Sequence, residues 1–264
     1  MPIKQNKDFI YGYNSITEMT GKYSDMLMDF GILKMDNNQT YSKNSKLESA
    51  YLLLFGKIKI EWDNNSKIID RDNCFDANPS CLHVPPNTNV TITCLNINTE
   101  IAVIKTSNNK TFKSVMYTPE NIRSEMRGKG TMKETSTRNV RTIFDKKNAP
   151  NSNLVLGEVI GYPGKWSSYP PHHHPQPEIY FYKFNPSNGY GFSELGNDVI
   201  KLEENITVKV TPGKTHPQVC APGYAMYYLW AIRHLEGNPY IEPIFVEEHT
   251  WVTKKDAIIW PDKK

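Results

Sequence analysis

Short apolar and aromatic runs, separated by polar clusters, make up most of this chain. Clusters such as Asp36-Asn37-Asn38 and Asp63-Asn64-Asn65-Ser66 interrupt the runs, and helical periodicity is scarce. Many short strands separated by turns are typical of β-sandwiches and barrels, so the pattern predicts an all-β fold. The expected strands lie within 26–35, 50–62, 89–96 and 101–106 in the first half, and within 153–162, 178–184, 206–211, 224–234 and 244–250 in the second.

Residues 117–150 interrupt this pattern. They begin with a turn or short helix start at Thr118-Pro119-Glu120, and a basic, glycine-containing run over 127–141 follows. A stretch of this composition is expected to connect domains. The chain is therefore predicted to hold one β domain over 1–116, a linker over 117–150 and a second β domain over 151–264.

The two halves share a faint repeat. An acidic residue opens an apolar strand in each half, Glu48 in the first and Glu178 in the second, and a proline-containing turn follows, after Val84 and after Val210. The chemistry of the halves differs, because neither of these elements carries a histidine in the first half, whereas the turn of the second half ends in His216. Histidine-based chemistry is therefore expected in the second half.

Composition limits the class of protein. With 264 residues, 38% of them hydrophobic and 22% charged, the chain is long enough to bury a core and has the composition of a soluble globular protein. Its apolar runs are too short to cross a bilayer, and residues 1–8 lack the apolar stretch of a secretory signal. These features predict a cytoplasmic protein with no membrane partner. The four cysteines form no Cys-x-x-Cys pair and are expected to be buried free thiols.

The formal net charge of +3 points to no particular partner. The basic run over 127–141 lacks the interleaved aromatic residues and the recognition motif of a nucleic-acid-binding segment. Gly128 and Gly130 do not form a phosphate loop, since no Gly-Lys-Ser/Thr follows at the required spacing. We therefore expect no nucleic-acid partner, and the run either links domains or supplies cations to a small anion.

Three of the seven histidines are adjacent, at His172, His173 and His174, and Glu178 follows shortly after them. On an extended strand, His172 and His174 point to one face and His173 to the other. With His216 from a later turn, three neutral imidazoles and one carboxylate would suit Zn²⁺, Fe²⁺, Mn²⁺ or Ni²⁺. The alternative is a histidine-rich surface loop with His216 as an unrelated turn residue. The spacing of Glu178 and the later turn favour the metal site.

The order His172-x-His174-x3-Glu178, followed by Pro212-Gly213-x-x-His216, resembles the two motifs of the cupin superfamily. The resemblance implies a bicupin, with two double-stranded β-helix (jelly-roll) barrels in one chain, of which only the second holds metal ligands. Two details depart from the usual motifs. The glycine expected after the first strand is replaced near Asn185, and Pro212 stands one residue closer to the glycine than usual.

The segment from Gly164 to His174, Gly-Lys-Trp-Ser-Ser-Tyr-Pro-Pro-His-His-His, resembles the signature of the 5-deoxy-glucuronate isomerase family, the bicupin isomerases of myo-inositol catabolism. The related 5-keto-4-deoxyuronate isomerases lack its Trp-Ser-Ser-Tyr part. The resemblance is strong over 117–251 and looser before. Departures lie close to the site: His173 replaces a lysine, a short Pro175-Gln176-Pro177 stands before the glutamate, and Trp230 replaces an asparagine.

This resemblance implies an aldose–ketose isomerase that converts 5-deoxy-D-glucuronate into 5-dehydro-2-deoxy-D-gluconate. A divalent metal, with zinc as first expectation and manganese or iron as further options, would act as a Lewis acid. An enediolate route needs a base, and the residues near the site leave four unranked candidates: His173, Tyr180, Tyr182 and Tyr228. The substrate carboxylate needs a cation, for which the candidates are Arg127, Arg138, Arg141 and Lys165.

Other interpretations stand beside this one. The tyrosines are alternatively core residues, and the arginines alternatively only hold the linker. A non-catalytic sugar-binding bicupin and an Fe²⁺-dependent cupin dioxygenase are the rival functions, since both are compatible with the same ligands. By analogy with cupins, a homo-oligomer is expected.

Overall fold

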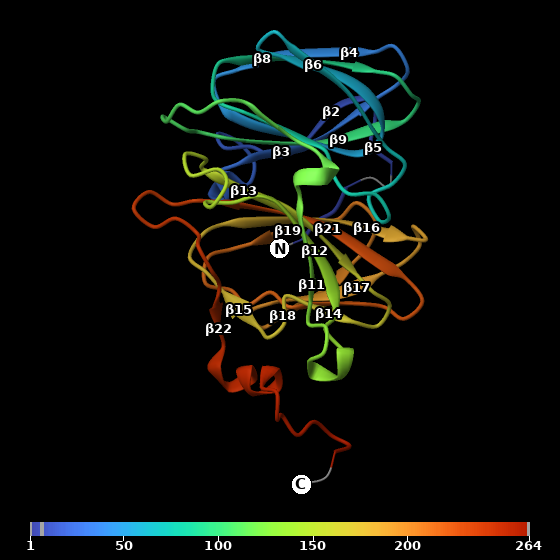
Figure 1. Cartoon of the computed structure of the whole chain (residues 1–264), viewed down its shortest axis with the longest axis vertical. Coiled ribbons are helices and arrows are strands. Elements are labelled where there is room, and N and C mark those ends of the chain that lie inside the picture. Colours follow the sequence, from blue (N-terminus) through green and yellow to red (C-terminus); the bar gives the residue numbers. More distant parts are fainter. Residues whose placement is uncertain (1, 6–7, 263–264) are drawn as a thin grey trace. The chain divides into compact units, whose positions relative to one another are not determined.

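The computed structural model describes residues 2–5 and 8–262, and nearly all of its regular structure is β-strand (Figure 1). The all-β prediction is confirmed. The chain divides into two compact units: an N-terminal unit of Asn6–Ile122 with Ile143–Leu156, and a C-terminal unit of Met1–Gln5, Arg123–Thr142 and Gly157–Lys264. No helix of the described residues is long and apolar enough to span a membrane.

The N-terminal unit is built on one long strand, β5. Strands β7 and β9 pair with the first part of β5, and β6 and β8 with its last part, so β5 belongs to two curled sheets. A register shift between Leu53 and Phe55, followed by Gly56 at φ 105°, marks the point where β5 passes from the first sheet to the second. A side chain at Gly56 would also collide with Thr99. The elements are β2 (Gly12–Thr17), η1 (Ser24–Met26), β3 (Asp29–Met35), β4 (Thr40–Ser45), β5 (Glu48–Trp62), β6 (Asn65–Arg71), β7 (Cys81–Val84), β8 (Thr88–Cys94), β9 (Thr99–Thr106), β10 (Val115–Tyr117) and η2 (Pro119–Asn121).

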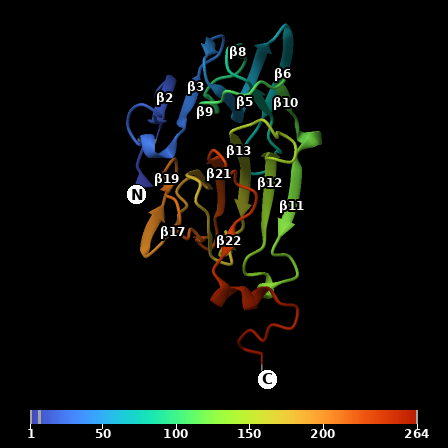
Figure 2. The same cartoon turned by 90° about the vertical axis from the view of Figure 1, so that its left-hand side faces the viewer.

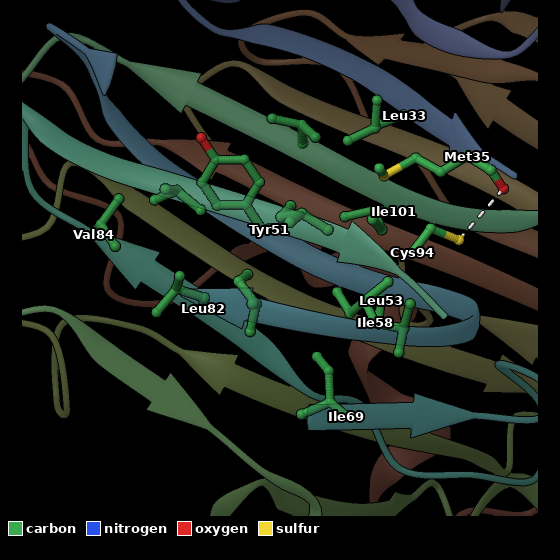
Figure 3. Packing of buried hydrophobic residues seen from close by; sticks show 14 residues of the cluster. Leu33, Met35, Tyr51, Leu53, Ile58, Ile69, Leu82, Val84, Cys94 and Ile101 are labelled. Atoms are coloured by element: carbon green, nitrogen blue, oxygen red, sulfur yellow. Dashed lines mark hydrogen bonds between the residues drawn. The ribbon is translucent and has the colours of Figure 1, made fainter. Parts of the chain in front are cut away.

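Alternate residues of these strands fill the interior of the N-terminal unit. Tyr51 and Leu53 of β5 pack with Leu82 and Val84 of β7 in one buried cluster, as Figure 3 shows. The thiol of Cys94 lies in the same cluster and donates to a backbone carbonyl. All four cysteines of the chain are free and buried, as predicted.

The C-terminal unit contains a seven-stranded sheet in the order β1-β19-β16-β21-β13-β12-β11, a four-stranded sheet β14-β20-β17-β18, and the pair β15–β22. Tyr180, Tyr182 and Phe184, alternate residues of β16, face its core. The elements are β1 (Pro2–Ile3), β11 (Arg123–Arg127), η3 (Met132–Glu134), β12 (Arg138–Phe144), β13 (Leu154–Gly161), β14 (Trp166–Ser167), β15 (His172–His173), β16 (Glu178–Asn185), β17 (Gly191–Leu195), β18 (Asp198–Leu202), β19 (Thr207–Val210), β20 (Gln218–Cys220), β21 (Ala225–Arg233), β22 (Ile244–Phe245) and η4 (Glu247–Thr253).

Two strands, β11 and β12, lie within the segment expected to be a linker. β11 and β12 run antiparallel along the edge of the seven-stranded sheet, side by side in Figure 2, with Arg127 opposite Arg138. Residues 123–142 therefore belong to the C-terminal unit, whereas 117–122 and 143–156 belong to the N-terminal unit. This arrangement places Arg127 and Arg138 in the same unit as the histidines.

Strand register corrects one part of the expected repeat. Val84 is opposite Ser49, and Val210 is opposite Glu178. If the two valines are aligned, as the repeat places them, the equivalent of Glu178 is Ser49 and not Glu48. Side chains alternate along a strand, so this one-residue difference places Glu48 on the face of β5 that points away from the barrel core.

Candidate metal centre

The predicted ligands come from three neighbouring segments of the C-terminal unit. Glu178 is the first residue of β16, on the same face as Tyr180, and His174 lies in the short connection between β15 and β16. His216 follows the turn after β19. That turn is held beside the first segment because the backbone N–H of Gly213, at φ 78°, donates to the carbonyl of His174 at 2.9 Å.

His174, Glu178 and His216 form a compact cluster. Their ligand atoms all lie within 4.8 Å of one another, and all three residues are buried. Oε2 of Glu178 lies 3.1 Å from Nε2 of His174 and 3.5 Å from Nε2 of His216. A tight group of two imidazoles and a carboxylate is a donor set that divalent transition metals prefer.

The hydrogen bonds of the histidines fix which ring nitrogen faces the cluster. Nδ1 of His174 donates to the carbonyl of Gln176 and Nδ1 of His216 to that of Lys214, each at 2.9 Å. In a neutral imidazole the other nitrogen, Nε2, then carries a lone pair. The lone pairs of both rings converge on a carboxylate, and Nε2 of His216 has no hydrogen-bond partner within the described chain. A cation between the ring nitrogens and the carboxylate would relieve the repulsion between the nitrogen lone pairs and the negative charge of Glu178. The residues therefore fit a bound metal.

His172 lies beside this cluster. Its ring is edge-on to that of His216, with centroids 4.8 Å apart, and its Nδ1 donates to the carbonyl of Pro170 at 3.1 Å. Burial, together with the neighbouring His216, lowers the pKa of His172 to about 3, which keeps the ring neutral. Burial likewise lowers the pKa of His216. Three of the four predicted ligands thus make up the compact group, and the fourth borders it.

A cavity of about 200 Å³ opens next to the cluster. His172, His174 and Glu178 contribute to its wall, together with polar residues of several other segments. The pair β15–β22 brings the C-terminal segment to its rim, where Phe245 is opposite His172. The other polar wall residues are Arg127, Arg138, Ser168, Tyr169, Tyr180, Tyr228 and Tyr240.

Tyrosine hydroxyls in and behind the wall are held by one hydrogen-bonded network. The hydroxyl of Tyr228 lies 2.5 Å from Oγ of Ser167, and that of Tyr180 lies 3.4 Å from Oγ of Ser168. Gln218 links Ser168 to the hydroxyl of a third tyrosine, Tyr182, which does not line the cavity. Burial raises the pKa of all three tyrosines, so their hydroxyls keep their protons at neutral pH.

Of the four predicted cations, Arg138 has the most informative surroundings. Its Nη1 donates to the carbonyl and the hydroxyl of Ser136, at 2.8 and 3.0 Å, and burial lowers its pKa. No carboxylate in the described part of the chain pairs with this buried guanidinium, which faces the cavity. A buried cation without a counter-ion is costly unless an anionic ligand binds it.

The other cations are placed differently. Arg127 also lines the cavity, but it is half exposed and bonded to Glu125 at 3.0 Å. Arg141 does not line it and lies 3.6 Å from Glu158, in the protein interior. Neither Lys165, in the turn before β14, nor His173, on the far side of β15, contributes to the wall.

A model of the KduI/IolB family matches residues 3–252 of the chain. The chain belongs to the KduI/IolB family. Relatives in this family named 5-deoxy-glucuronate isomerase include the protein of Geobacillus kaustophilus, which is 29% identical over 76% of this chain and 77% of its own length. The protein of Bacillus subtilis strain 168 is 25% identical over 85% and 88%. The isomerase class expected from the sequence is therefore confirmed.

Solved structures agree on the fold. An IolB-like protein from Salmonella typhimurium LT2 superposes with a TM-score of 0.82, at 20% identity, over 92% of this chain and 96% of that one. An oxalate decarboxylase from Lactobacillus farciminis superposes with a TM-score of 0.65, at 9% identity, over 91% and 86%. The predicted cupin fold is confirmed by this likeness.

Some residues of the KduI/IolB site had little signal in the sequence. Ser167 and Ser168 were part of the recognised segment, but their bonds to Tyr228 and Tyr180 depend on tertiary contacts. Gln218 had no signal. The rim residues Tyr240 and Pro243 follow the last long strand in a segment without a regular pattern. Phe245 lies in the strand expected over 244–250, but this strand, β22, ends at Phe245 and the 3-10 helix η4 follows. Alternation along β21 could have placed Trp230 in the wall, since it lies two residues from Tyr228.

Proposed function

We propose that this chain is a metal-assisted isomerase that converts 5-deoxy-D-glucuronate into 5-dehydro-2-deoxy-D-gluconate in inositol catabolism. The names of the relatives support this substrate. The observation that carries the proposal is the pairing of two features in one cavity. The buried guanidinium of Arg138, which pairs with no carboxylate of the described residues, faces the same space as the cluster of His174 and Glu178. This arrangement suits a small molecule with a carboxylate at one end and a reactive carbonyl at the other.

The divalent metal would be held by His174, Glu178 and His216, with His172 beside them. When bound, such an ion supplies Lewis-acid polarisation of the sugar carbonyl. Zinc, manganese and iron all suit this donor set. The backbone carbonyls of Gln176 and Lys214 already fix the ring orientations of His174 and His216.

The other wall residues bind and orient the sugar. Arg138 binds the carboxylate through the part of its guanidinium that Ser136 does not occupy. The protonated hydroxyls of Tyr180 and Tyr228 donate to the sugar oxygens at which negative charge develops. Ser167 fixes the position of the Tyr228 hydroxyl through their hydrogen bond. The isomerisation moves one hydrogen from C2 to C1 and one proton from O2 to O1, so it needs no oxygen and no external reductant.

The test is an assay of the purified, metal-loaded protein on a panel of uronate aldoses under anaerobic conditions, with the products followed by NMR. We expect conversion of the aldose to the 2-ketose, loss of activity on chelation, and recovery when metal is returned. Absence of any aldose–ketose conversion would contradict the proposal. In a parallel aerobic assay, consumption of O₂ would indicate a cupin dioxygenase instead, and binding without conversion would indicate a sugar-binding module.

A further inference from the structure

The cavity has an apolar side that the proposed chemistry does not use. Val140, Val159, Trp230 and Ile232 all line it, and none of them offers a hydrogen-bond group except the indole N–H of Trp230. The two valines are almost fully buried, with 5% and 4% of their surface exposed. We call these four residues the apolar strip.

Strand order places the strip between the two ends of the proposed substrate. In the seven-stranded sheet, β16, β21, β13 and β12 are consecutive neighbours. Glu178 is on β16 and Arg138 on β12, whereas Trp230 and Ile232 are on β21 and Val159 is on β13. Three strand spacings amount to about 14 Å along a flat sheet, and less across a curved one. A ligand that reaches from Arg138 to the metal ligands must therefore cross the strip.

The strip begins directly beside the proposed carboxylate site. Val140 is two residues from Arg138 on β12, so both side chains point to the same face of the strand. A carboxylate bound by Arg138 would place the carbon atom bonded to it beside this apolar side of the cavity. A hydroxyl on that carbon would lose its water without gaining a partner from the valines.

Trp230 fixes the middle of the strip. It is opposite Tyr180 on the neighbouring strand, and its indole packs over Gly157 of β13. A Cβ at residue 157 would lie only 2.5 Å from the indole ring, so the glycine makes room for it. The indole is thereby held against the sheet as part of a fixed wall.

We propose that the apolar strip selects uronates that carry a methylene next to the carboxylate and rejects those with a hydroxyl there. This inference rests on the proposed function, because it takes the carboxylate to be bound at Arg138. It names the specificity-determining residues of that site, chiefly Val140 and Val159. An apolar pocket rejects an added hydroxyl by about a hundredfold at most, so we expect a preference of about ten- to a hundredfold.

A matched pair of small open-chain acids tests the selection without depending on turnover. The probes are 3,4-dihydroxybutanoate and 2,3,4-trihydroxybutanoate, which differ only by the hydroxyl next to the carboxylate. Their Kd values are measured by calorimetry on the wild-type protein and on Val140→Thr and Val159→Thr, which add a hydroxyl to the wall at nearly constant volume. Val199→Thr, at a position 74% exposed on β18, is the control. Circular dichroism verifies that each variant is folded.

We expect the wild-type protein to bind the dihydroxy acid about ten- to a hundredfold more tightly. At least one of the two wall variants should reduce this ratio about threefold or more, and Val199→Thr should leave it unchanged. Chelation of a bound metal by the added hydroxyl acts on every variant alike, so the change in the ratio is decisive. Equal affinities in the wild type, no saturable binding of the dihydroxy acid, or an unchanged ratio in both wall variants would overturn the inference. Failure of the proposed function appears separately, as absence of isomerisation with the selective binding intact.

Discussion

Each unit of this chain buries a glutamate next to a histidine, and the two pairs have opposite surroundings. In the C-terminal unit, Glu178 faces Nε2 of His174 and of His216, the ring nitrogens that are not bonded to backbone carbonyls. In the N-terminal unit, Glu48 lies 2.8 Å from Nε2 of His83 and is entirely buried. Each glutamate is the first residue of a long strand of its unit. Aligning the two halves by sequence alone therefore pairs Glu48 with Glu178.

The hydrogen-bond partners separate the two. Oε1 of Glu48 accepts from His83 and from Ser152 at 2.5 Å, and its Oε2 accepts from the side chain of Asn108 at 2.7 Å and the backbone of Asn153 at 2.9 Å. Burial alone raises the pKa of Glu48, but these donors outweigh it and lower the pKa below the usual value. The carboxylate is therefore saturated by donors and has no acceptor site left for a metal.

The position of each glutamate on its strand explains the difference. Glu178 points into its barrel, where two histidines meet it. Glu48 is one residue out of phase and points away from the barrel core, where it ties residues 108 and 152–153 to the sheet. A shift of one residue along a strand thus separates a candidate metal ligand from a structural clamp.

Removing a ligand should have the largest effect. His216→Ala leaves Glu178 and His174 without their third partner, and we expect kcat/KM to fall about a thousandfold, since the metal contributes several kcal/mol of transition-state stabilisation. Steady-state kinetics on aldose conversion measures the loss. His83→Ala is the matched histidine in the other unit, and its folded fraction should keep wild-type activity. Comparable losses of kcat/KM in folded His216→Ala and folded His83→Ala would contradict the assignment of the metal ligands to the C-terminal unit.

Glu48→Gln should affect stability instead of catalysis. The substitution removes the charge that His83, Ser152 and Asn108 surround, and breaking a buried network of this kind costs about 3 kcal/mol in free energy of unfolding. Urea denaturation followed by circular dichroism measures the change. The kcat/KM of the folded variant should stay within about twofold of wild type. An unchanged urea midpoint would show that this pair is not a clamp.

Arg138→Met should weaken substrate binding. The variant keeps the bulk of the side chain but loses the guanidinium, and truncating one side of a buried charge pair costs about 2 kcal/mol or more. We therefore expect KM to rise about 30-fold, with a smaller change in kcat. Arg127→Met, at the half-exposed wall position, should raise KM less. If Arg127→Met has the larger effect, the carboxylate binds elsewhere in the cavity.

The smallest effect concerns pH. Burial lowers the pKa of His172 to about 3, from an ordinary value of 6.5, so below pH 6.5 the unfolded chain binds a proton that the folded chain does not. Stability should therefore fall as the pH falls from 6.5 toward 3. Urea midpoints between pH 7 and pH 5 avoid the titration of most carboxylates. In His172→Phe the urea midpoint should decrease less steeply between pH 7 and pH 5 than in the wild type. An unchanged pH dependence of the midpoint would mean that another group controls it.

Much of this site could be predicted from the sequence, because its signals are local. The spacing of His172, His174 and Glu178, and the Pro-Gly turn before His216, lie within short segments. The two strands within the expected linker were harder to predict, since β11 pairs with β12 at the sheet edge and β12 joins the sheet beside β13. Sequence order also aligned Glu48 with Glu178, whereas the pairing of β5 with β7 and of β16 with β19 shows which face each glutamate occupies. Strand pairing, which depends on tertiary contacts, determines the face on which such a residue lies.

The difference between the two glutamates is tested most directly by the metal content of Glu178→Gln and Glu48→Gln, which make the same isosteric change in the two units. Both proteins are purified in parallel with wild type, verified as folded, and analysed by mass spectrometry for bound transition metal per chain. We predict that Glu178→Gln loses its metal and that Glu48→Gln keeps the wild-type amount. Retention of metal by folded Glu178→Gln, or its loss from folded Glu48→Gln, would contradict the assignment of the metal centre to the C-terminal unit.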